Sequence, residues 1–278
     1  MIKILVDAAS DITKEEAYEK NIDILPIEIT LDSNVFIEGE NITRNEFYEM
    51  MLNQKGFAKT SLVPPQKFFE YFKQQKDQNN EVIYIGLSSK LSGTFNSAFM
   101  AKEQVEYDSI YLVDSLSASY AIKILADIAL KMIVEGKTAK EIHAYLEEMK
   151  KKVTIYACLD TLEFLKRGGR INSTAAFIGE LVNLKPIITI NPEGKIEVVS
   201  KALGRTRGII NILKLLKKKK ISVQFPKYIL YSYGDYNCDR FEEKLLENQY
   251  GMQGRLQIGP TIGAHIGPEA FGIVFVEE

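Results

Sequence analysis

The sequence lacks the features that would tie it to a membrane or to nucleic acid. Its 278 residues contain no run of about eighteen apolar residues, the length that a membrane-spanning helix requires. The formal net charge is only −2, so no basic field favours nucleic acid. The apolar start of the chain reaches Asp7 too soon for a secretory signal peptide. We therefore expect a cytoplasmic protein that binds no nucleic acid.

Cysteine and histidine are scarce, which limits the redox and metal chemistry open to the chain. Cys158 and Cys238 are isolated, so we expect reduced thiols in or near the core rather than a disulfide framework. His143 and His265 are the only histidines, and no His or Cys spacing is typical of zinc. A metal site would need carboxylates, and acids after strands are too common to predict one. We predict no metal and no cofactor.

Familiar catalytic motifs are incomplete. Residues 86–90 lack the second glycine of a nucleophile elbow. Gly136-Lys137-Thr138 resembles the end of a P-loop, but Lys131 occupies the position of its first glycine. No GxGxxG dinucleotide fingerprint is present. The sequence thus offers no motif for transferring phosphate from a nucleotide.

Apolar strands alternate with predicted helices in the first half of the chain. Strands beginning at Ile2, Val82 and Ile110 each end in a cluster of Ser and Asp residues and precede a helix. This alternation predicts an α/β fold with a parallel, doubly wound sheet, whose three polar clusters share the edge where ligands bind. The second half mixes hairpins with helices, which indicates an α+β domain with a mixed sheet. We place the domains at residues 1–152 and 153–278.

Local signals place further elements. Capping boxes at residues 43–46 and 138–141 predict two helix starts. Residues 24–30 and 228–233 are predicted strands, and residues 160–167, 172–184 and 204–220 are predicted helices.

The loop at residues 86–94 is the first candidate binding site. A buried strand turns there into small hydroxyl residues and Gly93, just before a predicted helix. The first amides of a helix lack internal partners and can bind an anion, with Ser92 and Thr94 as further donors. The alternative is that Ser92 or Thr94 only caps the helix.

Two further stretches have a structural and a functional interpretation. His265 lies between Gly263 and Gly267 in an apolar segment, as either a buried imidazole bonded to a carbonyl or a ligand-binding group. The Lys166–Arg170 turn carries three cations, which are either solvated helix-end charges or a clamp for phosphate or carboxylate.

Together these motifs resemble the DegV family, whose members include the fatty-acid-binding subunit of the bacterial fatty acid kinase. The resemblance covers almost the whole chain. It rests on VDAASDI at 6–12, KTS at 59–61, GLSSKLSGT at 86–94, VDS at 113–115, LEFLKRGGRI at 162–171, KP at 185–186, RTR at 205–207 and HIGP at 265–268.

The resemblance implies a two-domain DegV-like fold with one lipid between the domains. The positions that would hold the fatty acid carboxylate are Thr60, Ser61, Ser92, Gly93 and His265. Arg170 matches a position tied to the head group or to the phosphorylated product.

The chain departs from the family pattern at three places. Ala8 stands where Ser is usual, Leu62-Val63-Pro64 replaces Gln-Pro-Ser, and Glu269 replaces Gly. The second departure puts in doubt how the loop closes over the head group.

The resemblance further implies a carrier without catalysis of its own and with at most transient membrane contact. It would present the carboxylate of a long-chain fatty acid to a separate ATP-dependent fatty acid kinase and carry the acyl phosphate away. Arg170, and more weakly Lys201, Arg205 and Arg207, would face that kinase. One alternative is a lipid hydrolase or acyltransferase using a serine with His265; another is a small-anion binder.

Overall fold

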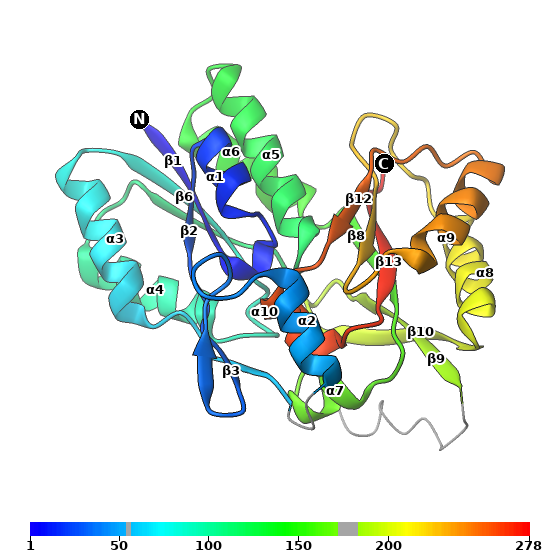
Figure 1. Cartoon of the computed structure of the whole chain (residues 1–278). Coiled ribbons are helices and arrows are strands. Elements are labelled where there is room, and N and C mark those ends of the chain that lie inside the picture. The colour runs from blue at the N-terminus through cyan, green and yellow to red at the C-terminus, as the bar shows by residue number, and fades with distance from the viewer. Residues whose placement is uncertain (54–56, 172–182) are drawn as a thin grey trace.

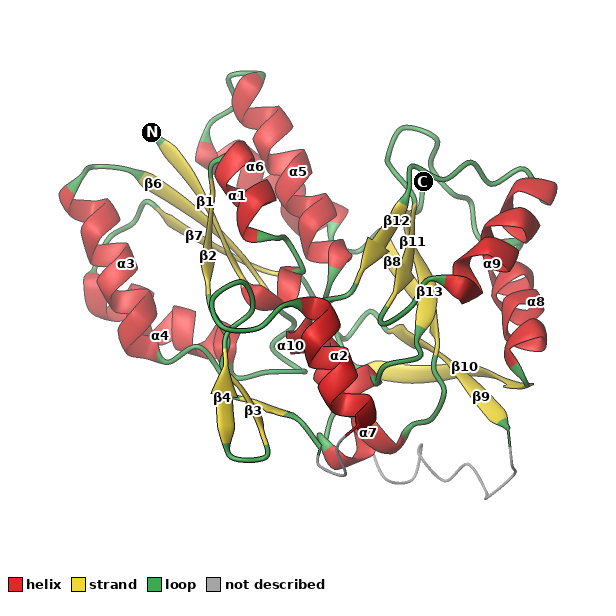
Figure 2. Cartoon of the chain, viewed as in Figure 1, coloured by secondary structure: helices red, strands yellow, loops and turns green. Residues whose placement is uncertain are grey.

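The computed structural model describes residues 1–53, 57–171 and 183–278, and these residues form three sheets with helices around them (Figure 1, Figure 2). We call them the N-terminal sheet, the C-terminal sheet and the small sheet. The first two are built from successive parts of the chain, whereas the small sheet and its neighbours join the beginning of the chain to its end.

The N-terminal sheet is parallel, in the order β2-β1-β6-β7. Its strands are β1 (Ile2–Asp7), β2 (Ile22–Leu25), β6 (Glu81–Gly86) and β7 (Ile110–Asp114). Figure 1 shows α3 (Pro65–Asp77) and α4 (Thr94–Val105) on one side, and α1 (Lys14–Lys20), α5 (Tyr120–Val134) and α6 (Ala139–Met149) on the other. Because both faces are covered, the strands are apolar throughout rather than alternating.

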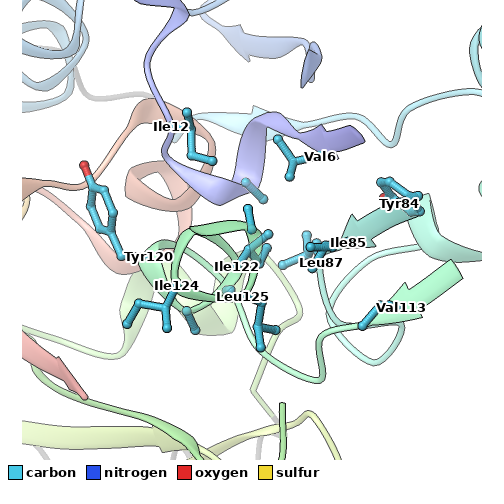
Figure 3. Packing of buried hydrophobic residues seen from close by; sticks show 14 of the residues in the cluster. Val6, Ile12, Tyr84, Ile85, Leu87, Val113, Tyr120, Ile122, Ile124 and Leu125 are labelled. Carbon is cyan, nitrogen blue, oxygen red and sulfur yellow. The ribbon is translucent and has the colours of Figure 1, made fainter. Parts of the chain in front are cut away.

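Part of the core of this layer lies between the sheet and α5. Figure 3 shows Ile85 and Leu87 close to Ile122 and Leu125 of α5, and all four side chains are buried. Helix α5 therefore packs on the sheet near the point where the chain leaves β6.

The C-terminal sheet is mixed, in the order β10-β9-β8-β13-β11-β12. Its strands are β8 (Val153–Cys158), β9 (Leu184–Ile190), β10 (Ile196–Leu203), β11 (Tyr228–Tyr231), β12 (Arg255–Gln257) and β13 (Phe271–Val276). All neighbours are antiparallel except β11 and β12. Helices α8 (Arg205–Leu216) and α9 (Tyr236–Glu247) cover one face, with Ile212 and Phe241 in a core shared with Phe271. The other face is turned toward the N-terminal half.

The small sheet has the order β4-β3-β5, from β3 (Ile29–Leu31), β4 (Asn34–Phe36) and β5 (Lys59–Thr60). It shares a core with α2 (Arg44–Asn53) and with α10 (Pro260–Ile266), through Phe47, Tyr48 and Ala264. Two short elements complete the fold, a 3₁₀ turn at Ala8–Ser10 and α7 (Glu163–Arg167). Helix α10, from the end of the chain, thus packs on elements from its beginning.

The predicted fold class is confirmed: a parallel α/β/α layer is followed by a mixed-sheet α+β part. Both capping boxes form, and Glu141 and Thr138 bond reciprocally. The predicted division at 152/153 falls between α6 and β8, and it stays a prediction.

Several element predictions were wrong in detail. The span 24–30 is two strands, because Pro26 has no amide to donate to a ladder. The strand predicted to Tyr233 ends at Tyr231, and the helix predicted to residue 220 ends at Leu216. The helix predicted from residue 160 begins at Glu163. The helix predicted at 172–184 lies almost wholly outside the described residues, and its last residue, Leu184, begins a strand.

Candidate functional site

A cavity lies between the carboxyl edge of the N-terminal sheet and the inner face of the C-terminal sheet. The space between its lining atoms is about 850 Å³, part of which is open to solvent. Its apolar wall comes from both halves and consists of Ile27, Leu87, Leu91, Ala118, Ile155, Ala157, Leu165, Ile188, Ile190, Ile196, Leu230, Ile258, Ile262 and Ile266. Such a wall suits an alkyl chain.

The polar lining includes a contact between two distant segments. Thr60 on β5 and His265 in the last turn of α10 are joined by a 2.8 Å hydrogen bond between Oγ1 and Nε2. Both residues line the cavity. The small sheet and α10 therefore bring a hydroxyl and an imidazole together at one place.

The loop after β6 supplies Ser92 to the same cavity. The Ser92 hydroxyl accepts a 3.2 Å bond from the Thr94 amide and lies 3.0 Å from the Thr94 hydroxyl. Thr94 Oγ1 in turn accepts a 3.2 Å bond from the Val63 amide. Ser92 thus accepts from the first amide of α4 and also lies at the cavity wall. The N-cap itself is Gly93, without a side-chain capping bond, so the interpretation of Ser92 or Thr94 as the cap was wrong.

Gly93 and Ser61 lie at the edge of this region. Gly93 is the N-cap of α4 with φ −73°, is exposed, and does not line the cavity. A Cβ there would lie 3.1 Å from Leu62 Cδ2, so the Leu62 side chain lies against Gly93 without burying it. Ser61 lines the cavity but is exposed, and its hydroxyl donates to the Glu28 carbonyl at 3.3 Å. The cavity therefore opens to solvent near Ser61.

Arg170 lines the cavity, and its guanidinium donates hydrogen bonds to backbone carbonyls. Its Nε donates to Leu91 at 3.0 Å, and its Nη1 donates to Gly168. These bonds join the loop after β6 to the turn after α7. Five of the six predicted site residues therefore line one cavity, and the sixth, Gly93, lies beside it.

The protonation of His265 follows from its surroundings. Burial and, secondarily, the positive charge of Arg170 lower the pKa of the imidazole to about 4. The ring is therefore neutral near pH 7. Its Nδ1 has no hydrogen-bond partner among the described residues and faces Gly168, where a Cβ would approach it to 2.4 Å.

The other cations predicted to face a kinase, Lys201, Arg205 and Arg207, differ in whether another residue already pairs with them. Arg205 forms an ion pair with Glu269, and its Nη2 lies 3.6 Å from Asp160. Glu269, one of the three departures from the family pattern, therefore pairs with one of the cations predicted to face the kinase. Lys201 and Arg207 are exposed.

The serine-hydrolase arrangement is not assembled in this geometry. His265 Nε2 bonds to Thr60 rather than to Ser61 or Ser92. Across residues 1–53, 57–171 and 183–278, no carboxylate forms a hydrogen bond with His265. A nucleophile–base–acid relay would need such a carboxylate to orient the ring.

The acids at the strand ends meet at one edge, as predicted, but they bond to the protein itself. Asp7 accepts from the Tyr84 hydroxyl at 2.7 Å and from the Leu87 amide at 2.9 Å, and burial raises its pKa. Asp11 accepts from the Gly259 amide at 3.0 Å, and burial raises its pKa to about 7. Within the described ranges, no cluster of three or more His, Cys, Asp or Glu residues could hold a metal ion. In the same ranges, no helix combines the length and apolarity needed to cross a bilayer.

Sequence reasoning missed helix α10 and the cavity position of Thr261. Residues 261, 262, 265 and 266 line the cavity and lie on one face of α10, and Ile258, just before the helix, lines it as well. That spacing was available as a signal, but Gly259-Pro260, Gly263 and Gly267 made the segment look irregular.

Comparisons with known proteins agree with this geometry. A DegV domain-containing protein of Caldanaerobacter subterraneus is 31% identical over 100% of this chain and 99% of its own. A solved DegV family protein from Thermus thermophilus, described as binding fatty acid, matches with TM-score 0.88 and 27% identity, covering 100% of this chain and 99% of its own. DegV from Bacillus subtilis, described as a fatty acid binding protein, matches with TM-score 0.84 and 28% identity, covering 100% and 99%. The sequence model of the DegV family, described as uncharacterised proteins, matches residues 1–278, and the chain belongs to that family.

Proposed function

We propose that the protein binds one long-chain fatty acid in this cavity, with the carboxylate near Thr60 and His265. The observation that carries the proposal is a mostly isoleucine and leucine wall that meets hydroxyls, an imidazole and a guanidinium. The Thermus and Bacillus relatives, both described as binding fatty acid, support the same ligand.

The energetics favour a long chain. Burying a sixteen-carbon chain at about 0.8 kcal/mol per methylene gives roughly 12 kcal/mol before the costs of binding. Ordering the chain and losing its free motion take back several kcal/mol. A small polar anion would gain nothing from the apolar wall, so the alternative of a small-anion binder is disfavoured.

The carboxylate is the costly end, because a buried unpaired charge is heavily penalised. The hydroxyls of Thr60 and Ser92 would offset that cost by donating hydrogen bonds, and Ser61 would do so after leaving the Glu28 carbonyl. The neutral imidazole of His265 would act through Thr60, with Nε2 donating to the Thr60 hydroxyl so that this hydroxyl donates to the carboxylate. A bound carboxylate would also raise the pKa of His265 from about 4, since a nearby negative charge favours the protonated ring.

We further propose that a separate ATP-dependent kinase phosphorylates the bound acid and that the protein carries the acyl phosphate. The exposed Ser61 at the opening supports access to the carboxylate from outside. Lys201 and Arg207 are exposed cations that suit contact with a kinase or a phosphate. Arg205 is a weaker candidate, because Glu269 already engages it. We propose no catalytic role for the chain itself.

The test is mass spectrometry of the purified protein, first native and then denatured. We expect one fatty acid per chain that is released on denaturation. Ser92→Ala should keep the fold and lose much of this lipid, whereas Ser89→Ala changes an exposed serine of the same loop outside the cavity and should retain it. Protein without lipid would overturn the proposal, and an acyl adduct that survives denaturation would favour the hydrolase or acyltransferase.

A further inference from the structure

Two buried polar atoms on α10 have no hydrogen-bond partner among the described residues. They are Thr261 Oγ1 and His265 Nδ1, and both residues line the cavity. Leaving a buried donor or acceptor unpaired costs about 1–3 kcal/mol. Polar atoms left unpaired in a ligand cavity are candidates for contact with the ligand.

Thr261 differs from the other threonines at the cavity. Thr60 is bonded to His265, and the Thr189 hydroxyl donates to the Ile155 carbonyl at 2.8 Å. Thr261 is 3% exposed, so solvent does not satisfy its hydroxyl. His265 Nδ1 faces the turn at Gly168. The Thr261 hydroxyl is therefore the unpaired group that a ligand can reach.

The helix places Thr261 beside the first part of the acyl chain rather than at its carboxylate. Thr261 and His265 are four residues apart and lie on the same face of α10. Four residues span roughly 6 Å along a helix. If the carboxylate lies at His265, as proposed above, and the acyl chain runs along α10, that distance reaches roughly the fifth or sixth carbon of an extended chain.

We infer that Thr261 determines ligand specificity, and that the cavity accepts fatty acids that carry a hydroxyl group on roughly the fifth or sixth carbon, counted from the carboxyl carbon. A hydroxyl of the acid would pair with Thr261, whereas a plain methylene leaves it unpaired. This inference rests on the proposed fatty acid binding and adds the class of acid.

The experiment measures dissociation constants for palmitic acid and for its 5-hydroxy and 6-hydroxy derivatives. The delipidated proteins are the wild type, Thr261→Val, Thr261→Ser and Thr189→Val. Valine matches threonine in shape but removes the hydroxyl, and serine retains it. Thr189→Val makes the same change at a cavity threonine whose hydroxyl is already bonded.

The wild type should bind at least one hydroxy acid more tightly than palmitic acid. We expect Thr261→Val to reduce this preference roughly tenfold, partly by binding palmitic acid more tightly. Thr261→Ser and Thr189→Val should keep the preference. An unchanged ratio in Thr261→Val overturns the inference and leaves fatty acid binding intact. If Thr261→Val does not fold, the Thr261→Ser variant decides. Loss of the preference for the hydroxy acid in that variant overturns the inference, and retention of the preference supports it. A wild type that binds none of the acids overturns both proposals.

Discussion

Gly168→Ala is the most direct test of how His265 is held. Gly168 is the C-cap of α7 with φ −72° and ψ −10°, a conformation that alanine adopts without strain. Its new Cβ would lie 2.4 Å from His265 Nδ1 and 3.1 Å from Cε1. Ordinary contact begins at 3.4 Å, so the ring must move by about 1 Å. The 2.8 Å bond between His265 and Thr60 would not survive that movement.

The expected loss is the hydrogen bond that the Thr60 hydroxyl, held in place by His265, would donate to the bound carboxylate. Hydrogen bonds to charged groups contribute about 1.5–3 kcal/mol. This corresponds to a roughly 10- to 100-fold larger dissociation constant for a fatty acid. The free energy of unfolding should change little, because the backbone is unstrained and the methyl displaces one side chain.

Calorimetric titration of delipidated protein with palmitic acid gives the affinity, and NMR of the imidazoles reports the ring. The chain has two histidines, so His143 serves as an internal reference for His265. Gly251→Ala is the matched control, since a Cβ there meets nothing within 4 Å and its φ is not in the left-handed region. Unchanged affinity together with unmoved His265 resonances in Gly168→Ala would refute the reasoning.

Three further predictions concern stability and reactivity. Gly272→Ala places a Cβ 2.2 Å from the Tyr156 carbonyl oxygen on the neighbouring strand, so we expect a loss of about 3 kcal/mol or more, measured from the denaturant midpoint. The pKa of His265 is about 4 in the folded protein and about 6.5 in the unfolded chain, so the free energy of unfolding should fall by up to about 3 kcal/mol as the pH drops from 6.5 to 4. In urea titrations at several pH values, His265→Asn should make the free energy of unfolding less dependent on pH in this range. Burial raises the pKa of Cys158 and Cys238 to about 12, so both thiols should react with a thiol reagent at pH 8 only as fast as the protein opens.

The sheets were predictable because their strands carry a strong local signal. The strands at Ile2, Val82 and Ile110 are short runs rich in β-branched residues, and burial on both faces makes such runs continuous. Helix ends were less predictable, since Lys217 caps α8 in a stretch of lysines that carries no stop signal. Helix α10 was missed because its sequence contains glycine and proline, which usually interrupt helices. Gly263 is nevertheless required by close packing, since a Cβ on it would lie 2.3 Å from the Tyr48 hydroxyl.

The site was less accessible to local reasoning than the sheets were. Thr60 and His265 are separated by 205 positions, and no spacing rule connects them. The family resemblance supplied Thr60 and assigned His265 to the same site, whereas the local context of His265 left a structural and a ligand-binding role open. Thr261 illustrates the opposite failure: its helical spacing to His265 was present in the sequence, but only the structure shows that its hydroxyl is buried and unpaired.

The start of α10 is held by the N-terminal half of the chain, and this constrains how a ligand can enter. Asp11 binds the Gly259 amide at 3.0 Å, Tyr48 donates to the Ile258 carbonyl at 2.8 Å, and Tyr120 donates to the Gln257 carbonyl at 2.6 Å. These bonds are buried or partly buried, so breaking them without new partners is costly. A movement that separated the two halves would break all three and displace Thr261 and His265 together. Because that cost falls on the residues that would hold the acid, we expect ligand entry to proceed by local movement at the opening near Ser61 rather than by separation of the two sheets.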